Sequence, residues 1–170
     1  TDTDGDGYVD KDGQKLSINW LTYPTRLEQP KLAEYAQATL KDIGIDVVVN
    51  NTSDHMTIAK SGDFDVYVSS TTTAPTGDPE YFFTSTVTGV KNYGNYQNEE
   101  VTKLTDQLHQ TFDKDERAKL AVELQQDILD DDAFFFISHL NMGIVTKSNV
   151  TGMAAHPCDY YEITADLDKK

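Results

Sequence analysis

The first half of the chain alternates between the hydrophobic period of a strand and that of a helix. In residues 15–23 apolar side chains alternate with polar ones, which predicts a strand with one buried face. Residues 27–43 carry apolar side chains at helical spacing, and Gly44 follows where a left-handed C-terminal cap is favoured. The β-branched run at 45–49 predicts a buried strand, so the three segments predict a βαβ unit with parallel strands. A short helix at 54–61 and a strand at 64–69 extend this unit.

The second half of the chain is mostly helical in its pattern. Asn98 is a favoured N-cap residue, and a stripe of apolar residues follows it at helical spacing. The members of this stripe are Val101, Leu104, Leu108 and Phe112. Asp113 begins a capping-box pattern for a second helix, whose apolar positions are Ala121, Leu124 and Ile128. After this helix, the apolar runs at 134–137 and 142–145 predict two further strands.

Composition restricts the class of protein more than it identifies a function. The chain has 170 residues, of which 38% are hydrophobic, and this is typical of one soluble globular domain. Its net charge of −15 repels nucleic acid and anionic lipid, so we exclude both as partners. Cys158 is the only cysteine, which excludes an internal disulfide. The chain does not begin with Met, and we expect it to belong to a longer polypeptide.

The first ten residues resemble the front half of a calcium-binding loop. If the loop is counted from Asp2, then Asp2, Asp4 and Asp6 alternate as oxygen ligands would. Gly7 occupies the sixth position of the loop, and Asp10 occupies the ninth. Gly13 stands at the twelfth position, where such a loop needs a bidentate glutamate. One interpretation is a weak calcium site in the loop from Asp2 to Asp10. The other, which we favour, is an acidic hairpin tip where Asp and Gly supply the turn geometry.

The segment 77–80, Gly-Asp-Pro-Glu, marks the candidate binding site. It follows a predicted strand and precedes an aromatic group, so it delivers a carboxylate to the carboxyl end of that strand, where ligands bind in open α/β sheets. Gly77 and the following proline fix the backbone around Asp78, and Tyr81 begins the aromatic group of this cleft wall. Asp78 suits the ammonium group of a ligand. It equally suits a helix cap, and the spacing alone does not decide between these two roles.

No pattern in the chain supports catalysis. It contains neither a Gly-x-Ser-x-Gly motif nor a phosphate-binding loop, so we expect a binding protein and not an enzyme. Its 4 histidines lack the spacing of metal ligands. Two of them, His139 at the end of a predicted strand and His156 before a proline, have positions that would suit a cleft. A structural role for each is the simpler interpretation, and ligation of a metal is the alternative.

Short motifs in a fixed order make the chain similar to a known family. The motifs lie at residues 4–7, 11–13, 15–22, 40–47, 62–65, 77–83, 92–99, 115–117 and 126–133. In this order they resemble the C-terminal lobe of bacterial extracellular solute-binding proteins of family 5, which take up dipeptides, oligopeptides and nickel for ABC importers. The resemblance spans nearly the whole chain. Each motif is weak alone, and their specificity lies in the combination.

The resemblance implies a fold, a partner and a location. It implies a type II periplasmic-binding-protein-like lobe, which is an α/β structure with a mixed sheet flanked by helices. Residues 1–138 would form the second lobe of a two-lobe protein, and residues 139–170 would return towards the first. The whole protein would lie outside the cytoplasm, in a periplasm or anchored by lipid at the cell surface. It would deliver its ligand to the membrane permease of an ABC transporter.

The resemblance also implies ligands. In dipeptide-binding members the aspartate of the Gly-Asp-Pro turn pairs with the α-amino group of the peptide, and this role would fall to Asp78. Some nickel-binding members place a histidine in a loop where residues 85–91 of this chain have none, so His139 or His156 would have to replace it. We therefore expect a receptor for short peptides, and a receptor for nickel or a metal chelate is the alternative within the family. The acidic loop at residues 2–10 leaves an alternative of another class, a calcium-dependent adhesion or enzyme-associated domain.

Overall fold

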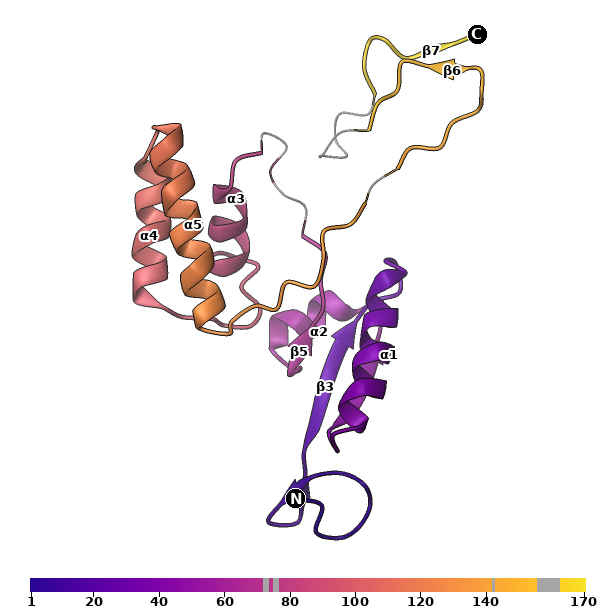
Figure 1. The fold of residues 1–170 in the computed structure, drawn as a ribbon, viewed down its shortest axis with the longest axis vertical. Helices are drawn as coiled ribbons and strands as arrows, with labels where there is room; N and C mark the ends of the chain where they lie inside the picture. Colours follow the sequence, from indigo (N-terminus) through magenta and orange to yellow (C-terminus); the bar gives the residue numbers. More distant parts are fainter. Residues whose placement is uncertain (72–73, 75–76, 142, 156–162) are drawn as a thin grey trace. The chain divides into compact units, whose positions relative to one another are not determined.

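The computed structural model describes residues 1–71, 74, 77–141, 143–155 and 163–170 (Figure 1). The chain divides into two compact units, Thr1–Ser70 and Thr71–Lys170. Neither cis peptide bonds nor a helix long and apolar enough to cross a bilayer occurs in this described part.

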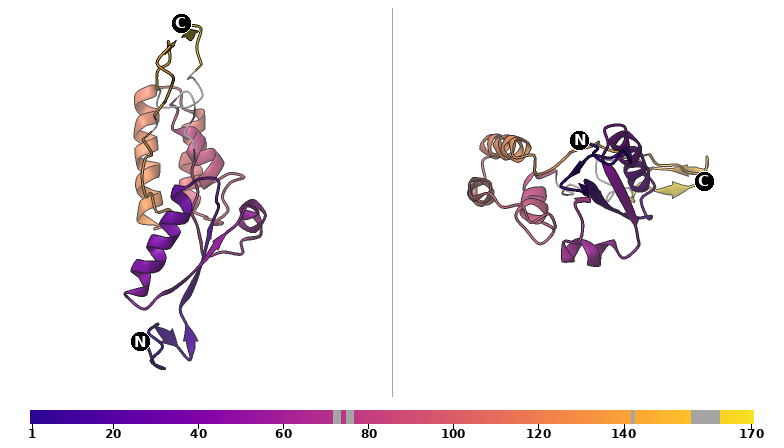
Figure 2. Two further views of the ribbon diagram at one scale, coloured as in Figure 1. Left: turned by 90° about the vertical axis from the view of Figure 1, so that its right-hand side faces the viewer. Right: turned by 90° about the horizontal axis from the view of Figure 1, so that it is seen from below.

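The first unit is built on a three-stranded parallel sheet. Its strands are β3 (Ser17–Thr22), β4 (Asp46–Asn51) and β5 (Val66–Tyr67), in the order β4-β3-β5. The connections are α1 (Glu28–Lys41) and α2 (His55–Ser61), which lie on opposite sides of the sheet (Figure 2). The βαβ unit that the sequence predicts is therefore confirmed, and Gly44 has the expected positive φ, 79°.

Two details of this sheet differ from expectation. Strand β5 contains two residues instead of the six expected at 64–69. Strand β4 is not buried on both faces, because Val47 is 2% exposed while Val48 is 52% exposed.

A hairpin of β1 (Asp10–Lys11) and β2 (Gln14–Lys15) precedes the sheet. Its turn places Asp12 and Gly13 at φ values of 55° and 74°, a region that favours Gly and Asp.

The second unit is a group of helices. It contains α3 (Glu80–Phe82), which continues into the π-helix η1 (Phe83–Val87), and the pair α4 (Glu99–Gln110) and α5 (Lys114–Asp130). Helices α4 and α5 lie side by side in every view (Figures 1 and 2). The buried core of the unit comprises Phe83, Val87, Val101, Leu104, Leu108, Leu120, Ala121, Leu124 and Ile128. The unit ends in a short antiparallel pair, β6 (Val150–Thr151) and β7 (Asp168–Lys169).

Local capping begins both long helices as the sequence predicts. The side chain of Asn98 accepts hydrogen bonds from the backbone N–H groups of Glu100 and Val101 at 2.8 and 3.1 Å. Asp113 does the same for the second helix, from the N–H groups of residues 115 and 116 at 3.1 and 3.0 Å. Each bond satisfies a backbone donor that has no partner inside the helix.

The acidic end of α5 has a structural explanation that its charge pattern did not suggest. Asp131 is the C-cap residue, and one of its carboxylate oxygens accepts hydrogen bonds from Tyr96 Oη at 2.6 Å and from Asn98 Nδ2 at 2.7 Å. The hydrogen bonds lower the pKa of Asp131, while burial and this carboxylate raise the pKa of Tyr96 to about 12. Tyr96 and Asn98, which lie just before α4, therefore supply hydrogen-bond donors to the carboxylate at the C-terminal end of α5.

The apolar segment after α5 is not the buried strand that we expected at 134–137. Phe134 and Phe136 pack edge-to-face on Phe82, with ring centroids 5.9 and 5.8 Å apart, but no strand pairs with them among the described residues. Phe135, between them, is 88% exposed. The strand expected at 142–145 is also absent at residues 143–145, where Val145 is 98% exposed, while residue 142 lies outside the described part. Phe112 is 92% exposed, so its place in the buried stripe was wrong.

Candidate functional site

The Gly-Asp-Pro turn begins α3 and uses its carboxylate as a cap. Gly77 has a φ of 73°, a left-handed conformation that other residues rarely adopt. Pro79, with φ −69°, has the backbone angle of a helix start. Asp78 Oδ1 accepts the backbone N–H of Glu80 at 2.9 Å. This is the capping geometry that the sequence offered as one of two roles for Asp78.

An arginine that we did not single out from the sequence holds the same carboxylate. Arg117 Nη2 donates to Asp78 Oδ1 and Oδ2 at 2.7 and 2.8 Å, and to Glu80 Oε2 at 2.9 Å. Its Nη1 donates to the backbone oxygens of Leu108 and Thr111, both at 2.7 Å. Residues 115–117 form one of the family motifs, but nothing in that spacing indicates a partner 39 positions earlier.

These contacts set the protonation of the two carboxylates. Burial disfavours ionisation of Asp78, but the hydrogen bonds from Glu80 N–H and Arg117 outweigh it, so the pKa of Asp78 is lowered. The hydrogen bond with His109 and, after it, the one from Arg117 lower the pKa of Glu80. The two carboxylates in turn raise the pKa of Arg117. Asp78 and Glu80 thus share one guanidinium, and Glu80 also contacts the imidazole of His109.

The predicted ligand-contacting residues are only partly brought together. The side chain of Asp78 is 41% exposed, and Tyr81, three residues on, is 42% exposed. Lys91 Nζ donates to Tyr81 Oη at 3.2 Å and lies 5.4 Å from the centre of its ring. His139 is exposed in the extended segment after α5, and within the described residues no hydrogen bond joins it to the turn. His156 lies outside the described residues, so the proposed pair of histidines is not tested.

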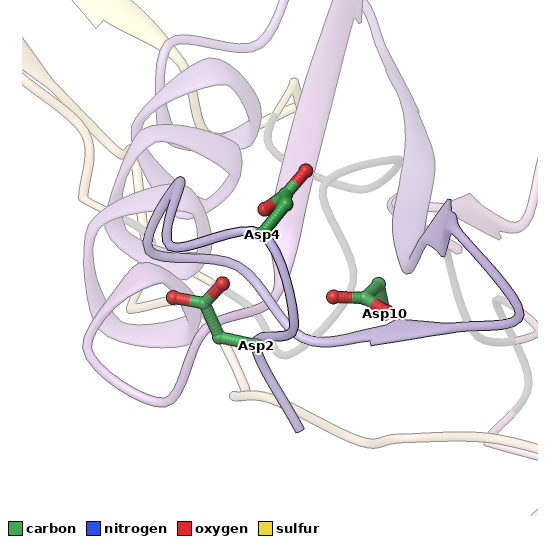
Figure 3. A group of neighbouring side chains, drawn as sticks. All are labelled: Asp2, Asp4 and Asp10. Atoms are coloured by element: carbon green, nitrogen blue, oxygen red, sulfur yellow. The ribbon is translucent and has the colours of Figure 1, made fainter.

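The acidic loop at the start of the chain gathers three carboxylates (Figure 3). One oxygen from each of Asp2, Asp4 and Asp10 lies within 4.8 Å of the others, whereas Asp6 is not part of the group. The loop already supplies donors to these carboxylates. Asp2 accepts from the N–H groups of residues 5 and 7 at 2.7 and 3.0 Å. Asp10 accepts from Oγ1 and N of Thr3 at 2.5 and 2.6 Å, and the side-chain hydrogen bond, then the backbone one, lowers its pKa.

A second group of polar aromatic residues lies at the carboxyl end of the sheet in the first unit. Tyr23 directly follows β3 and stacks on His55, with ring centroids 4.1 Å apart and an interplanar angle of 18°. His55 Nδ1 lies 2.8 Å from Tyr67 Oη, at the end of β5. The hydroxyl of Tyr23 accepts the backbone N–H of Ser70 at 3.3 Å. No local pattern in the sequence indicates this group, because its members come from three separate elements.

Known proteins resemble this chain over nearly its whole length. Oligopeptide-binding protein AppA of Bacillus subtilis is 29% identical over 168 residues, which is 95% of this chain and 31% of AppA. Nickel-binding protein NikA of Staphylococcus aureus is 28% identical over 161 residues, which is 93% of this chain and 32% of NikA. The chain therefore spans about a third of the length of these curated relatives.

Solved structures agree with these relatives in fold. The structure of Bacillus subtilis AppA in complex with a nonapeptide matches 95% of this chain and 33% of its own, with a TM-score of 0.77 and 27% identity. Staphylococcus aureus NikA in complex with Ni(L-His)2 matches 97% of this chain and 36% of its own, with a TM-score of 0.73 and 25% identity. The expected fold, an α/β periplasmic-binding-protein-like lobe of type II, is confirmed.

The family model for the middle region of bacterial extracellular solute-binding proteins, family 5, matches residues 1–94, which is more than half of the chain. The resemblance that the ordered motifs suggested is therefore confirmed. This chain belongs to family 5 of the bacterial extracellular solute-binding proteins.

Proposed function

We propose that the chain is part of the substrate-binding component of an ABC importer, and that this component binds short peptides by closing two lobes around a hinge. The observation that carries this proposal is the partly exposed carboxylate of Asp78, which the backbone N–H of Glu80 and the guanidinium of Arg117 hold in a fixed position. An ionised, partly exposed carboxylate in a fixed position suits the ammonium group of a peptide. AppA, which is similar over 95% of this chain, is an oligopeptide-binding protein.

The test uses the full-length polypeptide that carries this chain. A nonapeptide that binds is first selected from a randomised pool with free amino termini, and its affinity is measured by calorimetry. We expect Asp78→Ala to weaken binding of this nonapeptide at least tenfold, because the ammonium group loses a charged acceptor. Asp106→Ala, which removes an exposed carboxylate from α4, serves as the matched control. Equal affinity of wild type and Asp78→Ala would rule out Asp78 as the acceptor of the peptide's ammonium group. A pool that yields no binder would rule out the peptide-binding function.

The exposed segment after α5 supports the proposed course of the chain. We propose that residues 1–138 belong to the second lobe and that residues 139–170 return towards the first. Phe135 and Val145 are 88% and 98% exposed, and large apolar side chains in such positions favour burial against further protein. This course is consistent with a chain that spans about a third of its relatives. The proposed location of the whole protein is extracytoplasmic, and its proposed partner is a membrane permease.

A second candidate ligand is nickel or a nickel chelate. It is favoured by the similarity to NikA and by the exposed imidazole of His139. If the full-length protein binds nickel through His139 and His156, nickel retained after desalting should be lost in the variant that carries His139→Ala and His156→Ala. His109→Ala is the control, since this histidine contacts Glu80 instead. Absence of retained nickel in the wild type at micromolar nickel would count against this function.

A further inference from the structure

Arg117 connects the candidate binding turn to the two long helices of its unit. It lies in the first turn of α5, and its side chain is only 15% exposed. Three of its hydrogen bonds go to the carboxylates of Asp78 and Glu80. The other two go to backbone oxygens at the C-terminal end of α4, Leu108 and Thr111. One guanidinium therefore fastens the turn to the end of one helix and the beginning of another.

The geometry of these contacts requires arginine and not merely a positive charge. A guanidinium presents several N–H donors in one plane, and here its two terminal nitrogens point to different groups. Nη1 donates to the backbone carbonyls at the end of α4, and Nη2 donates to the carboxylates. A lysine ammonium is a single point of charge on a flexible stem, so it cannot hold both sets of acceptors at these distances.

These hydrogen bonds also limit which carboxylate oxygen of Asp78 can accept a hydrogen bond from a ligand. A carboxylate has about four lone-pair positions. Within the described part of the chain Asp78 uses three of them, one for the N–H of Glu80 and two for Arg117. The remaining position belongs to Oδ2, and its direction is set by the contact with Arg117. An ammonium group that approaches Asp78 therefore meets one acceptor with a fixed orientation.

We infer that Arg117 is a positioning residue for ligand recognition: it orients the free lone pair of Asp78 towards the ammonium group of the ligand. The inference rests on the proposed peptide-binding function. Arg117 does not contact the ligand itself. It acts by fixing the turn, so its loss should affect recognition of the amino terminus more than recognition of the rest of the peptide.

The experiment compares two forms of one nonapeptide with the full-length protein. The nonapeptide selected above is used with a free amino terminus and with an acetylated one, and the ratio of the two dissociation constants measures recognition of the ammonium group. The main variant is Arg117→Lys, which keeps the charge and the helix but not the planar fork. The control is Lys119→Met, which changes an exposed residue two positions further along α5. Circular dichroism and thermal unfolding verify that each variant is folded.

We expect the wild type to prefer the free amino terminus at least tenfold. Arg117→Lys should bring this ratio close to one while affinity for the acetylated form changes less than twofold, and Lys119→Met should leave the ratio unchanged. An unchanged ratio in folded Arg117→Lys, or equal weakening of both peptides, would overturn the positioning role alone. A wild-type ratio of one would overturn the ammonium role of Asp78 and this inference with it. Absence of any peptide binder would overturn the proposed function.

Discussion

Arg117 donates hydrogen bonds to both carboxylate oxygens of Asp78, at 2.7 and 2.8 Å, across 39 positions of sequence. This contact joins the turn before α3 to the first turn of α5. It gives a carboxylate that we selected as a ligand partner a structural role as well. The two roles make different predictions, because only the structural one changes the stability of the ligand-free protein.

The pair of Asp78 and Arg117 should show energetic coupling. Arg117→Met should lower the free energy of unfolding by about 2 kcal/mol, because it leaves carboxylates and helix carbonyls without their donor. Asp78→Asn should cost less, about 1 kcal/mol, because this side chain is partly exposed to solvent. Urea unfolding of both single variants and the double variant measures the coupling. Strictly additive effects would show that the contact contributes no stability of its own.

Stability should fall in acid because of the same turn. The ordinary pKa values of 3.8 for Asp78 and 4.5 for Glu80 are lowered in the folded protein. A lowered carboxyl pKa stabilises the folded state above the unfolded pKa, and this stabilisation disappears as pH falls through the folded pKa. The free energy of unfolding should therefore begin to decrease below about pH 5.

Urea unfolding at several pH values between 3 and 7 tests this acid dependence. Arg117→Met should make the decrease shallower, because the variant lacks the guanidinium that lowers both pKa values. The matched control is again Lys119→Met, which should follow the wild-type curve. If Arg117→Met has the same acid dependence as the wild type, other carboxylates determine it.

The hydroxyl of Tyr96 should ionise at higher pH than that of an exposed tyrosine. Burial, with the hydrogen bond to Asp131, raises its pKa to about 12. A raised pKa gives stability that is complete below the unfolded value, near 10, and that is lost as pH rises towards 12. The difference in tyrosinate absorbance between wild type and Tyr96→Phe should therefore titrate well above pH 10. A difference that titrates at the ordinary value would contradict the hydrogen bond between Tyr96 and Asp131.

The acidic loop should show little response to calcium. Backbone and hydroxyl donors inside the loop already occupy oxygens of Asp2 and Asp10, so a calcium ion would have to replace these bonds. We expect thermal unfolding with millimolar calcium and with chelator to coincide. A ligand at about 100 times its dissociation constant adds roughly 2.7 kcal/mol of stability, so a real site would raise the melting temperature clearly. In that case, Asp4→Asn should remove the shift.

Local rules predicted the parts of this chain that depend on neighbouring residues. Asn98 and Asp113 begin helices because each caps N–H groups two and three residues ahead. The parallel strands β3 and β4 follow from a strand–helix–strand order with short links, in which a parallel crossover is strongly favoured. The family resemblance also follows from residues in sequence order, and the matched model confirms it.

Contacts between distant segments decided the rest. The sequence by itself determined the βαβ unit, the helix starts and an acidic turn at Asp78. Only the tertiary structure decided that Arg117 holds this turn, that Asp131 meets Tyr96, and that Phe112 and Phe135 lie in solvent. The physical reason is that periodicity and capping act over a few residues, whereas an ion pair or a buried face depends on which surfaces meet after folding.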